Sequence, residues 1–247
     1  MIIAPLKRRG TQFPDRIKRA AAMFAGRGLA IALLACAVPA TAKPALAPEP
    51  ETSRADFRGE AASENARAVA DWVVASGNSN GLPFVIVDKT GAKVFVFSPD
   101  GAIRGAAAAL LGLGPGDDSV PGIGQRKLAT ITPAERTTPA GRFEASLGND
   151  FEQDILWVDY ETSLSLHRVI VGRPADHRKN RLATPTPLDN RISYGCINVP
   201  VDFYDTVVMP IFTGTVGIVY ILPETKPIEA VFPIHEPASI SLAQDNR

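Results

Sequence analysis

Short hydrophobic runs alternate with turn-forming residues between positions 82 and 222, and most of these runs have the length and composition of β-strands. The segment LPFVIVDKTGAKVFVF at 82–97 contains two runs rich in β-branched and aromatic residues around a Lys-Thr-Gly turn, which predicts a hairpin. Further strands are predicted in RTTPAGRFEAS (136–146), LSLHRVIVG (164–172) and GTVGIVYIL (214–222). The pattern therefore predicts a mainly β fold.

Two segments show helical rather than strand periodicity. Ser63 is a suitable N-cap for a helix over 64–76, whose apolar stripe is expected to pack on the core. PVDFYDTVVMPIF at 200–212 has proline at its first helical position and apolar residues at helical spacing, which predicts a second helix. The alanine-rich AIRGAAAALLGLG at 102–114 has a helical composition, but its glycines weaken that interpretation.

The first 42 residues have the composition of an export signal. They carry seven basic residues against one acid, and the apolar run GLAIALLACAVPATA at 28–42 ends in the small residues of a cleavage site. This run is too short for a stable bilayer anchor. We expect a signal peptide over 1–42, with Cys36 as a lipid anchor in the alternative case of lipoprotein processing. The protein is therefore predicted to reach the periplasm or cell envelope of a bacterium.

The rest of the chain has 19 basic and 25 acidic residues, a net charge of −6 that gives no support for nucleic-acid binding. Residues 43–62 are rich in Pro, Ala and Glu and are predicted to form a disordered linker. The segment 63–81 holds the N-terminal helix and its connection, 82–223 forms one folded domain, and 224–247 is expected to be a flexible tail. We expect a monomer.

Cys196, in RISYGCINVP at 191–200, is the cysteine that remains after loss of the signal peptide. An unpaired thiol in an exported protein indicates either pairing between chains or a reactive group. The positive end of the helix that follows would favour the thiolate, and Gly195 permits a tight backbone whose N–H groups can bind an oxyanion. A small buried hydrophobic residue is the alternative, and the local sequence leaves both open.

A cysteine nucleophile needs a base, and His167 is the best candidate among three histidines. It lies in an otherwise apolar strand, where an imidazole without a hydrogen-bond partner is costly, so a structural histidine is the alternative. We expect His177, in a charged loop, and His235, in the predicted tail, to be exposed. Because the histidines are scattered and no second cysteine is near Cys196, we expect no metal and no cofactor.

The pieces RTTPAGRF, LSLHRVIVG and RISYGCINVP, followed by an apolar helix and GTVGIVYIL, together resemble the L,D-transpeptidase catalytic domain family (YkuD type). The resemblance covers residues 82–223 and is centred on a Ser-x-Gly-Cys element, followed by an apolar residue and Asn or Arg, with a histidine upstream. It implies a compact β-sandwich of mixed sheets with few short helices.

The resemblance also implies a reaction. Cys196 would attack a carbonyl of a peptidoglycan stem peptide, after an L-centre and before a D-amino acid, with His167 as general base. Backbone N–H groups of Tyr194, Gly195 and Cys196 would stabilise the oxyanion, and the acyl group would pass to an amine on another stem. The residues expected to contact the substrate are Arg191, Ser193 and Asn198.

The chain departs from the family pattern near the site. Tyr194 stands where the family often has His, and Arg168 follows the histidine where Gly is common. The segment 173–191 is longer than usual and rich in arginine. Because arginine binds carboxylates with paired N–H donors, we expect this segment to form a lid, with Arg191 facing the substrate. A solvated charged loop is the alternative.

Three functions remain open at this point. The first is a cysteine transpeptidase acting on peptidoglycan, and the second is a carboxypeptidase or amidase in which water accepts the acyl group. The third is a non-catalytic wall-binding relative, which Tyr194 and Arg168 would favour and the retention of His167 and Cys196 opposes. A papain-like peptidase is disfavoured because it places the cysteine before the histidine.

Overall fold

The computed structural model describes residues 53–150 and 152–234. The predicted signal peptide with Cys36, the first part of the predicted linker and His235 lie outside the described residues. Within the described ranges, no helix combines the length and the apolar character needed to cross a membrane.

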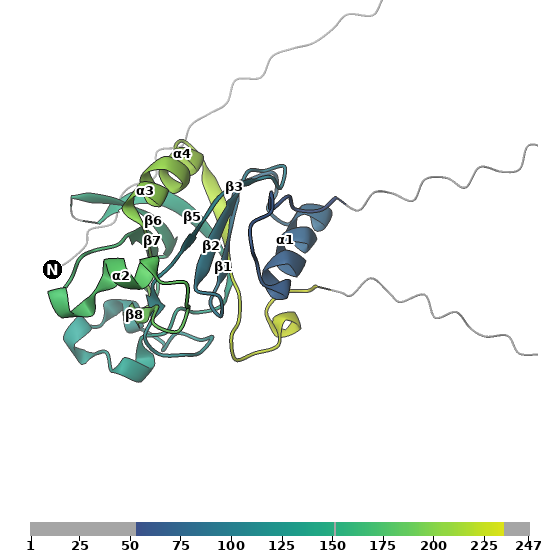
Figure 1. Cartoon of the computed structure of the whole chain (residues 1–247). Helices are drawn as coiled ribbons and strands as arrows, with labels where there is room; N and C mark the ends of the chain where they lie inside the picture. Colours follow the sequence, from purple (N-terminus) through teal and green to yellow (C-terminus); the bar gives the residue numbers. More distant parts are fainter. Residues whose placement is uncertain (1–52, 151, 235–247) are drawn as a thin grey trace, which may run out of the picture. The chain divides into compact units, whose positions relative to one another are not determined.

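Eight strands form one mixed sheet that is nearly closed into a barrel (Figure 1). Their order across the sheet is β3-β2-β1-β10-β5-β6-β7-β9, with β1–β10 and β7–β9 parallel and the other neighbours antiparallel. The strands are β1 (Phe84–Asp88), β2 (Lys93–Phe97), β3 (Ile103–Ala108), β5 (Gly141–Asp150), β6 (Gln153–Asp159), β7 (Leu164–Arg168), β9 (Ile197–Val199) and β10 (Val216–Ile221). A small second sheet pairs β4 (Leu111–Gly112) with β8 (Arg191–Ser193).

The predicted mainly β class with mixed pairing is confirmed. The predicted division into two packed sheets is replaced by one strongly curved sheet with a small satellite. The hairpin of β1 and β2 and the closing strand β10 lie where the sequence pattern predicts them. The alanine-rich segment forms β3 rather than a helix, because its residues pair with β2 from Lys93 to Phe97.

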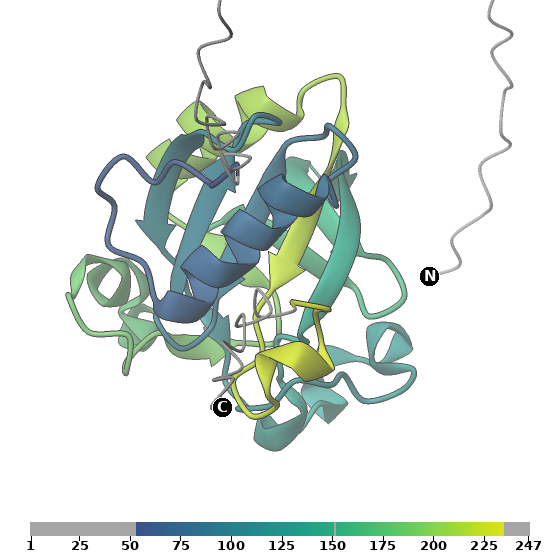
Figure 2. The ribbon, with the colours of Figure 1, turned by 90° about the vertical axis from the view of Figure 1, so that its right-hand side faces the viewer.

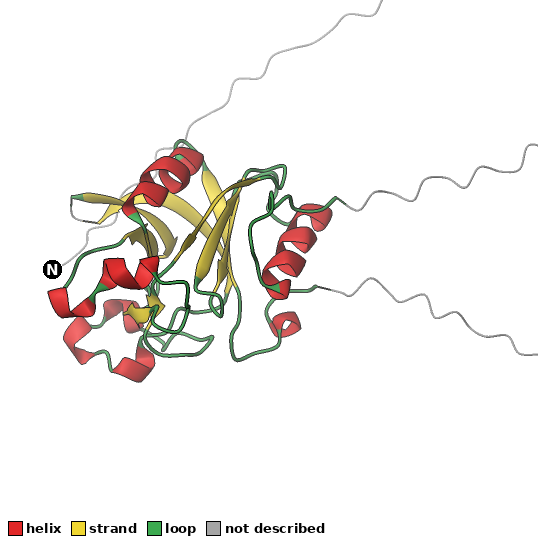
Figure 3. Ribbon diagram, in the orientation of Figure 1, coloured by secondary structure: helices red, strands yellow, loops and turns green. Residues whose placement is uncertain are grey.

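Helices surround this β body (Figure 3). The helical segments are α1 (Glu64–Ser76), α2 (Arg178–Ala183) and the consecutive α3 (Val201–Phe203), π-helical η5 (Tyr204–Val208) and α4 (Met209–Phe212). The 3₁₀ turns are η1 (Ile123–Gln125), η2 (Leu128–Thr130), η3 (Pro133–Glu135), η4 (Pro174–Asp176) and η6 (Ile228–Ala230). Both predicted helices are confirmed, and the Ser63 side chain accepts the Ala66 N–H at 3.1 Å as the expected N-cap.

The central strands are buried on both faces. Alternate residues such as Val85 and Val87 point into the barrel, where η5 and α4 close the interior with Val208 and Phe212. The intervening residues, such as Phe84, point outward and are covered by α1 (Figure 2). This double burial explains why β1 and β2 read as continuous hydrophobic runs rather than as alternating ones.

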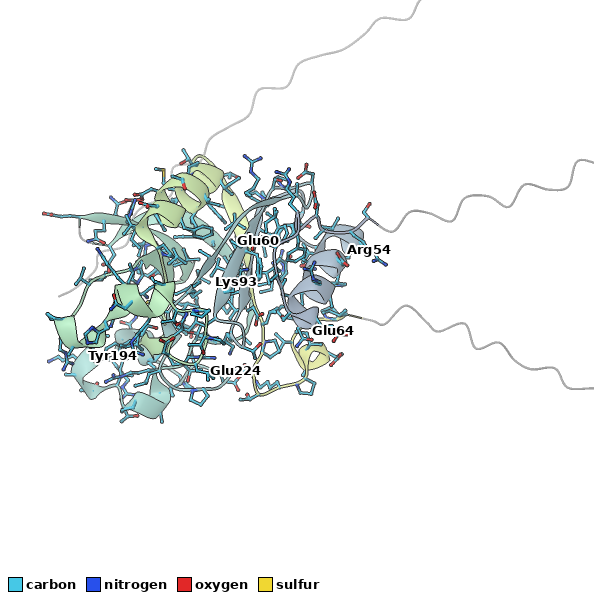
Figure 4. All side chains as sticks on the ribbon, viewed as in Figure 1. Arg54, Glu60, Glu64, Lys93, Tyr194 and Glu224 are labelled. Carbon is cyan, nitrogen blue, oxygen red and sulfur yellow. The ribbon has the colours of Figure 1, made fainter. Side chains whose placement is uncertain are left out.

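The predicted linker is not disordered over residues 53–62. Phe57 is only 4% exposed and packs edge-on against the rings of Phe95 and Phe97. Glu60 pairs with Lys93 at 2.9 Å, and both residues are labelled in Figure 4. Burial of Phe57, a β-bridge between Asp56 and Ala102 and the Glu60–Lys93 pair together anchor a segment whose overall composition is that of a linker.

The predicted flexible tail is also packed over residues 224–234. Phe232 is 1% exposed and lies against Trp72 of α1 and Tyr220 of β10. The segment 173–191 is not structureless either, because it contains η4 and the six-residue α2. Folded structure therefore extends beyond the predicted boundaries of the domain.

Candidate active site

Parallel pairing of β7 with β9 brings the predicted histidine and cysteine together. In this register Leu166 lies opposite Ile197 and His167 lies opposite Asn198. Leu164 and Leu166 point into the barrel core, so the alternate residues Ser165 and His167 face outward. Cys196 immediately precedes β9 and is therefore held beside the outward face of β7.

The Cys196 thiol is partly exposed and contacts the start of β7. The Ser165 hydroxyl donates to Sγ at 3.5 Å, and Sγ lies 3.6 Å from the backbone oxygen of Ser163. Ser165 was not singled out from the sequence. Its spacing of two residues from His167 is the signal that could have placed it on the same face.

The thiol and the imidazole shift each other's ionisation in opposite directions. Burial opposes the thiolate, but hydrogen bonding and charge attraction from His167, aided by Ser165, hold the pKa of Cys196 below its ordinary value of 9.0. Burial likewise opposes the imidazolium, but Cys196 and the Arg168 carbonyl raise the pKa of His167 above 6.5. Both shifts favour a thiolate–imidazolium pair, which is the nucleophilic form of such a dyad.

The ring orientation of His167 follows from one hydrogen bond. Its Nδ1 lies 2.7 Å from the backbone oxygen of Arg168, and because a carbonyl only accepts, Nδ1 carries the proton. Nε2 lies 3.4 Å from Nδ2 of Asn198. The side chain of Arg168 is directed elsewhere, to ion pairs with Asp154 and Asp205, so this departure from the family pattern leaves the orienting carbonyl in place.

The predicted effect of the following helix on the pKa of Cys196 does not agree with the position of that helix. The predicted helix begins at Val201, but the three-residue β9 lies between Cys196 and this helix. Three extended residues span roughly 10 Å, which is beyond the range of the first helical turn. The groups that lower the pKa of Cys196 are instead His167 and Ser165.

The backbone before the thiol requires glycine. Gly195 has φ +132°, and a Cβ there would lie 2.9 Å from the Thr137 oxygen. Thr138 fixes the same residue, because its hydroxyl donates to the Gly195 oxygen at 2.7 Å and accepts the Gly112 N–H at 2.9 Å. Thr138 is a site residue that the sequence indicated only as part of the resemblance.

The expected oxyanion role of Gly195 is corrected by its hydrogen bond. Its N–H donates to Ser193 Oγ at 3.1 Å, and that hydroxyl donates to the Cys196 oxygen at 2.6 Å. Within the described residues, the N–H groups of Tyr194 and Cys196 donate no such bond inside the loop. Two of the three expected donors therefore remain free.

Ser193 and Asn198 hold the loop rather than facing a substrate, which corrects their predicted role. Ser193 is buried, and its hydroxyl accepts the Gly195 N–H and donates to the Cys196 oxygen. Asn198 is buried too, and it donates to the Cys196 oxygen at 3.2 Å and accepts from Arg178 at 3.2 Å. Both residues position the cysteine backbone.

A cavity of about 200 Å³ opens beside Cys196. Its walls come from the loop between 119 and 139, from the turn at 162–164 and from residues 194–196. Within the described residues none of the lining side chains belongs to 173–191, so the expected lid over this cavity is wrong. Arg178 of this segment instead donates to Asn198, which lies beside His167. The lining is mixed, with apolar Ile123, Leu128 and Ile131 beside the guanidinium of Arg126.

The loop that forms the outer wall is braced by an ion pair. Arg126 contacts Glu135 at 2.7 Å, and this guanidinium, together with the Thr132 backbone N–H and hydroxyl, lowers the pKa of Glu135 to about 2. Thr132 and Glu135 also form a capping box at η3. Arg136, next in sequence, stacks on the Tyr194 ring at 3.9 Å, and Figure 4 labels Tyr194 in this part of the molecule.

Arg191 lies in a second polar site, which corrects its predicted contact with substrate. Its guanidinium pairs with Glu224 and donates to the Lys89 oxygen. Lys89 is 0% exposed at its side chain and pairs with the equally buried Asp117 at 2.6 Å. We call these four residues, Lys89, Asp117, Arg191 and Glu224, the buried charge cluster.

The buried charge cluster ties the C-terminal segment to the loop beneath the nucleophile. Asp117 accepts the backbone N–H groups of Glu224, Thr225 and Lys226 at 2.7–2.8 Å. Lys89 Nζ donates to the Thr138 oxygen at 2.9 Å, and Thr138 holds Gly195. The sequence did not indicate this cluster, because none of its members has a distinctive neighbourhood along the chain.

The buried charge cluster also has shifted ionisation. Burial lowers the pKa of Lys89, although Asp117 and Glu224 oppose that change. Burial alone would raise the pKa of Asp117, but hydrogen bonds from Lys89 and Thr225 and from backbone N–H groups hold it well below 3.8. Among the described residues, no group of three or more His, Cys, Asp or Glu side chains has the arrangement of a metal site.

Comparison with known proteins adds no assignment: no family model matches the chain, and no curated protein matches it.

Proposed function

We propose that the protein is an exported cysteine acyltransferase of the L,D-transpeptidase type, acting on peptidoglycan stem peptides in the periplasm or cell envelope. The observation that carries the proposal is the Cys196–His167 dyad with its matched pKa shifts, in which Cys196 lines an open cavity. The resemblance of the segments that hold the dyad to the L,D-transpeptidase catalytic domain supplies the substrate class.

In the proposed reaction the Cys196 thiolate attacks the stem carbonyl and forms the S–C bond. The oxyanion is stabilised by the free N–H groups of Tyr194 and Cys196. Collapse of the intermediate breaks the C–N bond, and the leaving amine takes its proton from His167 Nε2. Throughout these steps, the Nδ1–H bond to the Arg168 oxygen keeps the imidazole in the required orientation.

In the second half-reaction an amine of another stem, or water, attacks the thioester. His167 accepts the proton of the incoming nucleophile, the C–S bond breaks, and the thiolate is restored. An amine gives a cross-linked product, whereas water gives a shortened stem. Which of the two products forms depends on which acceptor reaches the cavity beside Cys196.

The test is incubation of the mature protein with purified disaccharide-tetrapeptide, followed by mass spectrometry of the products. The proposal predicts loss of the terminal D-amino acid and, with an amine acceptor, a joined pair of stems. Shortened stems alone would assign the carboxypeptidase reaction. Unchanged substrate with wild type, under conditions in which a thiol reagent modifies Cys196, would contradict both enzymatic functions.

A further inference from the structure

An aromatic pair lies on the outer surface of the barrel beside the cavity. The rings of Trp157 and Tyr160 stack with centroids 4.8 Å apart and an angle of 26° between their planes. Tyr160 is nevertheless 64% exposed. An exposed aromatic ring held by a second one presents a fixed apolar face to solvent, and such surfaces commonly bind ligands.

The strand beneath the pair is shaped to receive it. Gly148 of β5 lies under both rings, and a Cβ there would approach Trp157 Cδ1 to 2.7 Å and Tyr160 Oη to 3.7 Å. Any larger residue would push the indole away from the strand. Trp157 therefore rests on the sheet, and Tyr160, in the turn that follows β6, stacks on it.

The register of the sheet connects the aromatic pair to the nucleophile. Trp157 lies opposite Ser146 of β5 and opposite Ser165 of β7. Cross-strand partners project from the same face about 5 Å apart, and the Ser165 hydroxyl contacts the Cys196 thiol. Trp157 is thus one strand away from the residue that touches the nucleophile, on the same face.

The turn after the aromatic pair continues directly into the cavity wall. Two and three residues after Tyr160 come Thr162 and Ser163, which line the cavity beside Cys196. The Ser163 hydroxyl donates to the Gly124 oxygen on the opposite wall at 3.1 Å. A polymer that reaches Cys196 across this rim would pass over the ring of Tyr160.

The surroundings of the pair favour an uncharged, hydroxyl-rich ligand. Neighbouring positions on the same face of β5 are Glu144 and Ser146, β6 ends with Asp159, whose carboxylate accepts from Glu161 and Thr162, and the turn contributes Glu161. These carboxylates would repel the phosphates of a nucleic acid. A pyranose ring packs its C–H face on an aromatic ring and directs its hydroxyls to carboxylate and serine oxygens.

We propose that Trp157 and Tyr160 form a subsite that binds a sugar ring of the glycan strand while the attached stem peptide occupies the cavity at Cys196. The proposal rests on the proposed function for the identity of the polymer. It assigns the uncharged part of the substrate to the aromatic pair and the reacting part to the dyad.

The test measures sugar binding without turnover. The chain contains two tryptophans, so Trp72→Phe leaves Trp157 as the only indole reporter. Titration of this variant with the uncharged tetramer of N-acetylglucosamine should give a saturable change in indole emission. Calorimetric titration of the wild-type protein should give the same dissociation constant and does not depend on that variant.

The decisive variant is Tyr160→Ala, which removes the exposed ring and should weaken sugar binding about tenfold or more. It should leave the reaction of Cys196 with iodoacetamide unchanged, whereas a general loss of structure would alter that reaction. No sugar binding by wild type, or equal binding by Tyr160→Ala, would overturn the subsite. Saturable quenching by an aromatic peptide or a single-stranded oligonucleotide, but not by the sugar, would also overturn it.

Failure of the subsite and failure of the proposed function give different results. Sugar binding without turnover of disaccharide-tetrapeptide would remove the proposed function and leave a glycan-binding site. Turnover with the same Michaelis constant for glycan-linked and glycan-free tetrapeptide, together with no sugar binding, would remove the subsite and leave the enzyme.

Discussion

Two of the polar sites with perturbed ionisation, the buried charge cluster and the Cys196–His167 dyad, differ in what their charges can reach. In the buried charge cluster, Lys89 and Asp117 are closed off from solvent and paired with each other. At the dyad, Cys196 and His167 shift each other's pKa, and Cys196 lines a cavity that is open to solvent. Perturbed pKa values mark structural ion pairs as well as reactive sites, and access separates the two.

The two sites are linked through Thr138. Its backbone oxygen accepts from Lys89, and its hydroxyl donates to the Gly195 oxygen. The buried charge cluster therefore supports the loop that carries Cys196. Substitutions in the cluster should change stability first, whereas substitutions in the dyad should change chemistry while leaving the fold intact.

The largest expected effect is on chemistry. Cys196→Ala should reduce turnover of disaccharide-tetrapeptide by roughly 10⁴- to 10⁶-fold, because no other group supplies the nucleophile. The melting temperature should stay close to that of wild type, since only one small side chain is lost. Residual turnover within tenfold of wild type would remove Cys196 from the mechanism.

Replacement of His167 should change both the turnover and the pH dependence of the reaction of Cys196 with an alkylating reagent. His167→Asn should lower turnover by roughly 10²- to 10⁴-fold. Because His167 holds the pKa of the Cys196 thiol below 9.0, the pH midpoint of alkylation by iodoacetamide should rise in the variant. Wild type should stay reactive as the pH falls below 9.0, until the thiolate is protonated. Coincident pH profiles for the two proteins would show that the imidazole does not stabilise the thiolate.

The buried charge cluster should respond in stability. Lys89→Met leaves Asp117 buried without its cation and should lower the free energy of unfolding by about 3–5 kcal/mol in a denaturant titration. Lys93→Met is the matched control, because its pair with Glu60 is partly exposed and is worth at most about 1 kcal/mol. Equal losses in the free energy of unfolding for both variants would show that the buried Lys89–Asp117 pair contributes no more to stability than the exposed Lys93–Glu60 pair.

Acid should act on the buried charge cluster through Asp117. Its pKa in the folded protein lies well below 3.8, so its ionised form stabilises the fold above that pH, and the contribution is lost as the pH falls towards the folded value. Asp117→Asn should therefore be less stable than wild type at pH 7 by about 2–3 kcal/mol. The difference should shrink below pH 3.8, and a difference independent of pH would contradict this assignment.

The smallest expected effect lies at the link between the sites. Thr138→Val removes the hydroxyl that binds the Gly195 oxygen and the Gly112 N–H, and should cost about 1–2 kcal/mol of stability. It should also lower the turnover number more than it raises the Michaelis constant, because the nucleophile loop loses its support. Thr138→Ser keeps the hydroxyl and should restore turnover. A serine variant as impaired as the valine variant would contradict the assignment of this role to the hydroxyl.

The sequence predicted the parts of the fold that depend on local pattern. The cap at Ser63, the hairpin of β1 and β2 and the strand β10 all follow from residues close to one another in the chain. The strand β3 was ambiguous, because alanine favours a helix and only its pairing with β2 settles the outcome. The order of the segment around Phe57 does not follow from its composition, because it depends on contacts with residues distant in sequence, namely the rings of Phe95 and Phe97 and the bridge to Ala102.

The sequence predicted the dyad residues but not the roles of their neighbours. Cys196 and His167 stood out as a thiol without a partner and an imidazole in an apolar strand. Arg191 was expected to face the substrate because it lies near the thiol in sequence, but its partner Glu224 is distant along the chain. Proximity in sequence does not determine which way a side chain points across the sheet.

The central claim is that Cys196 carries an acyl group during the reaction. The most direct measurement is rapid mixing of the mature protein with disaccharide-tetrapeptide, followed by acid quenching and intact-protein mass spectrometry. One added mass, equal to the substrate without its terminal D-amino acid, is expected on the intact wild-type protein and, after digestion, on the peptide that contains Cys196, and no such mass is expected in Cys196→Ala. Product formation without this adduct in wild type, or the same adduct in Cys196→Ala, would contradict it.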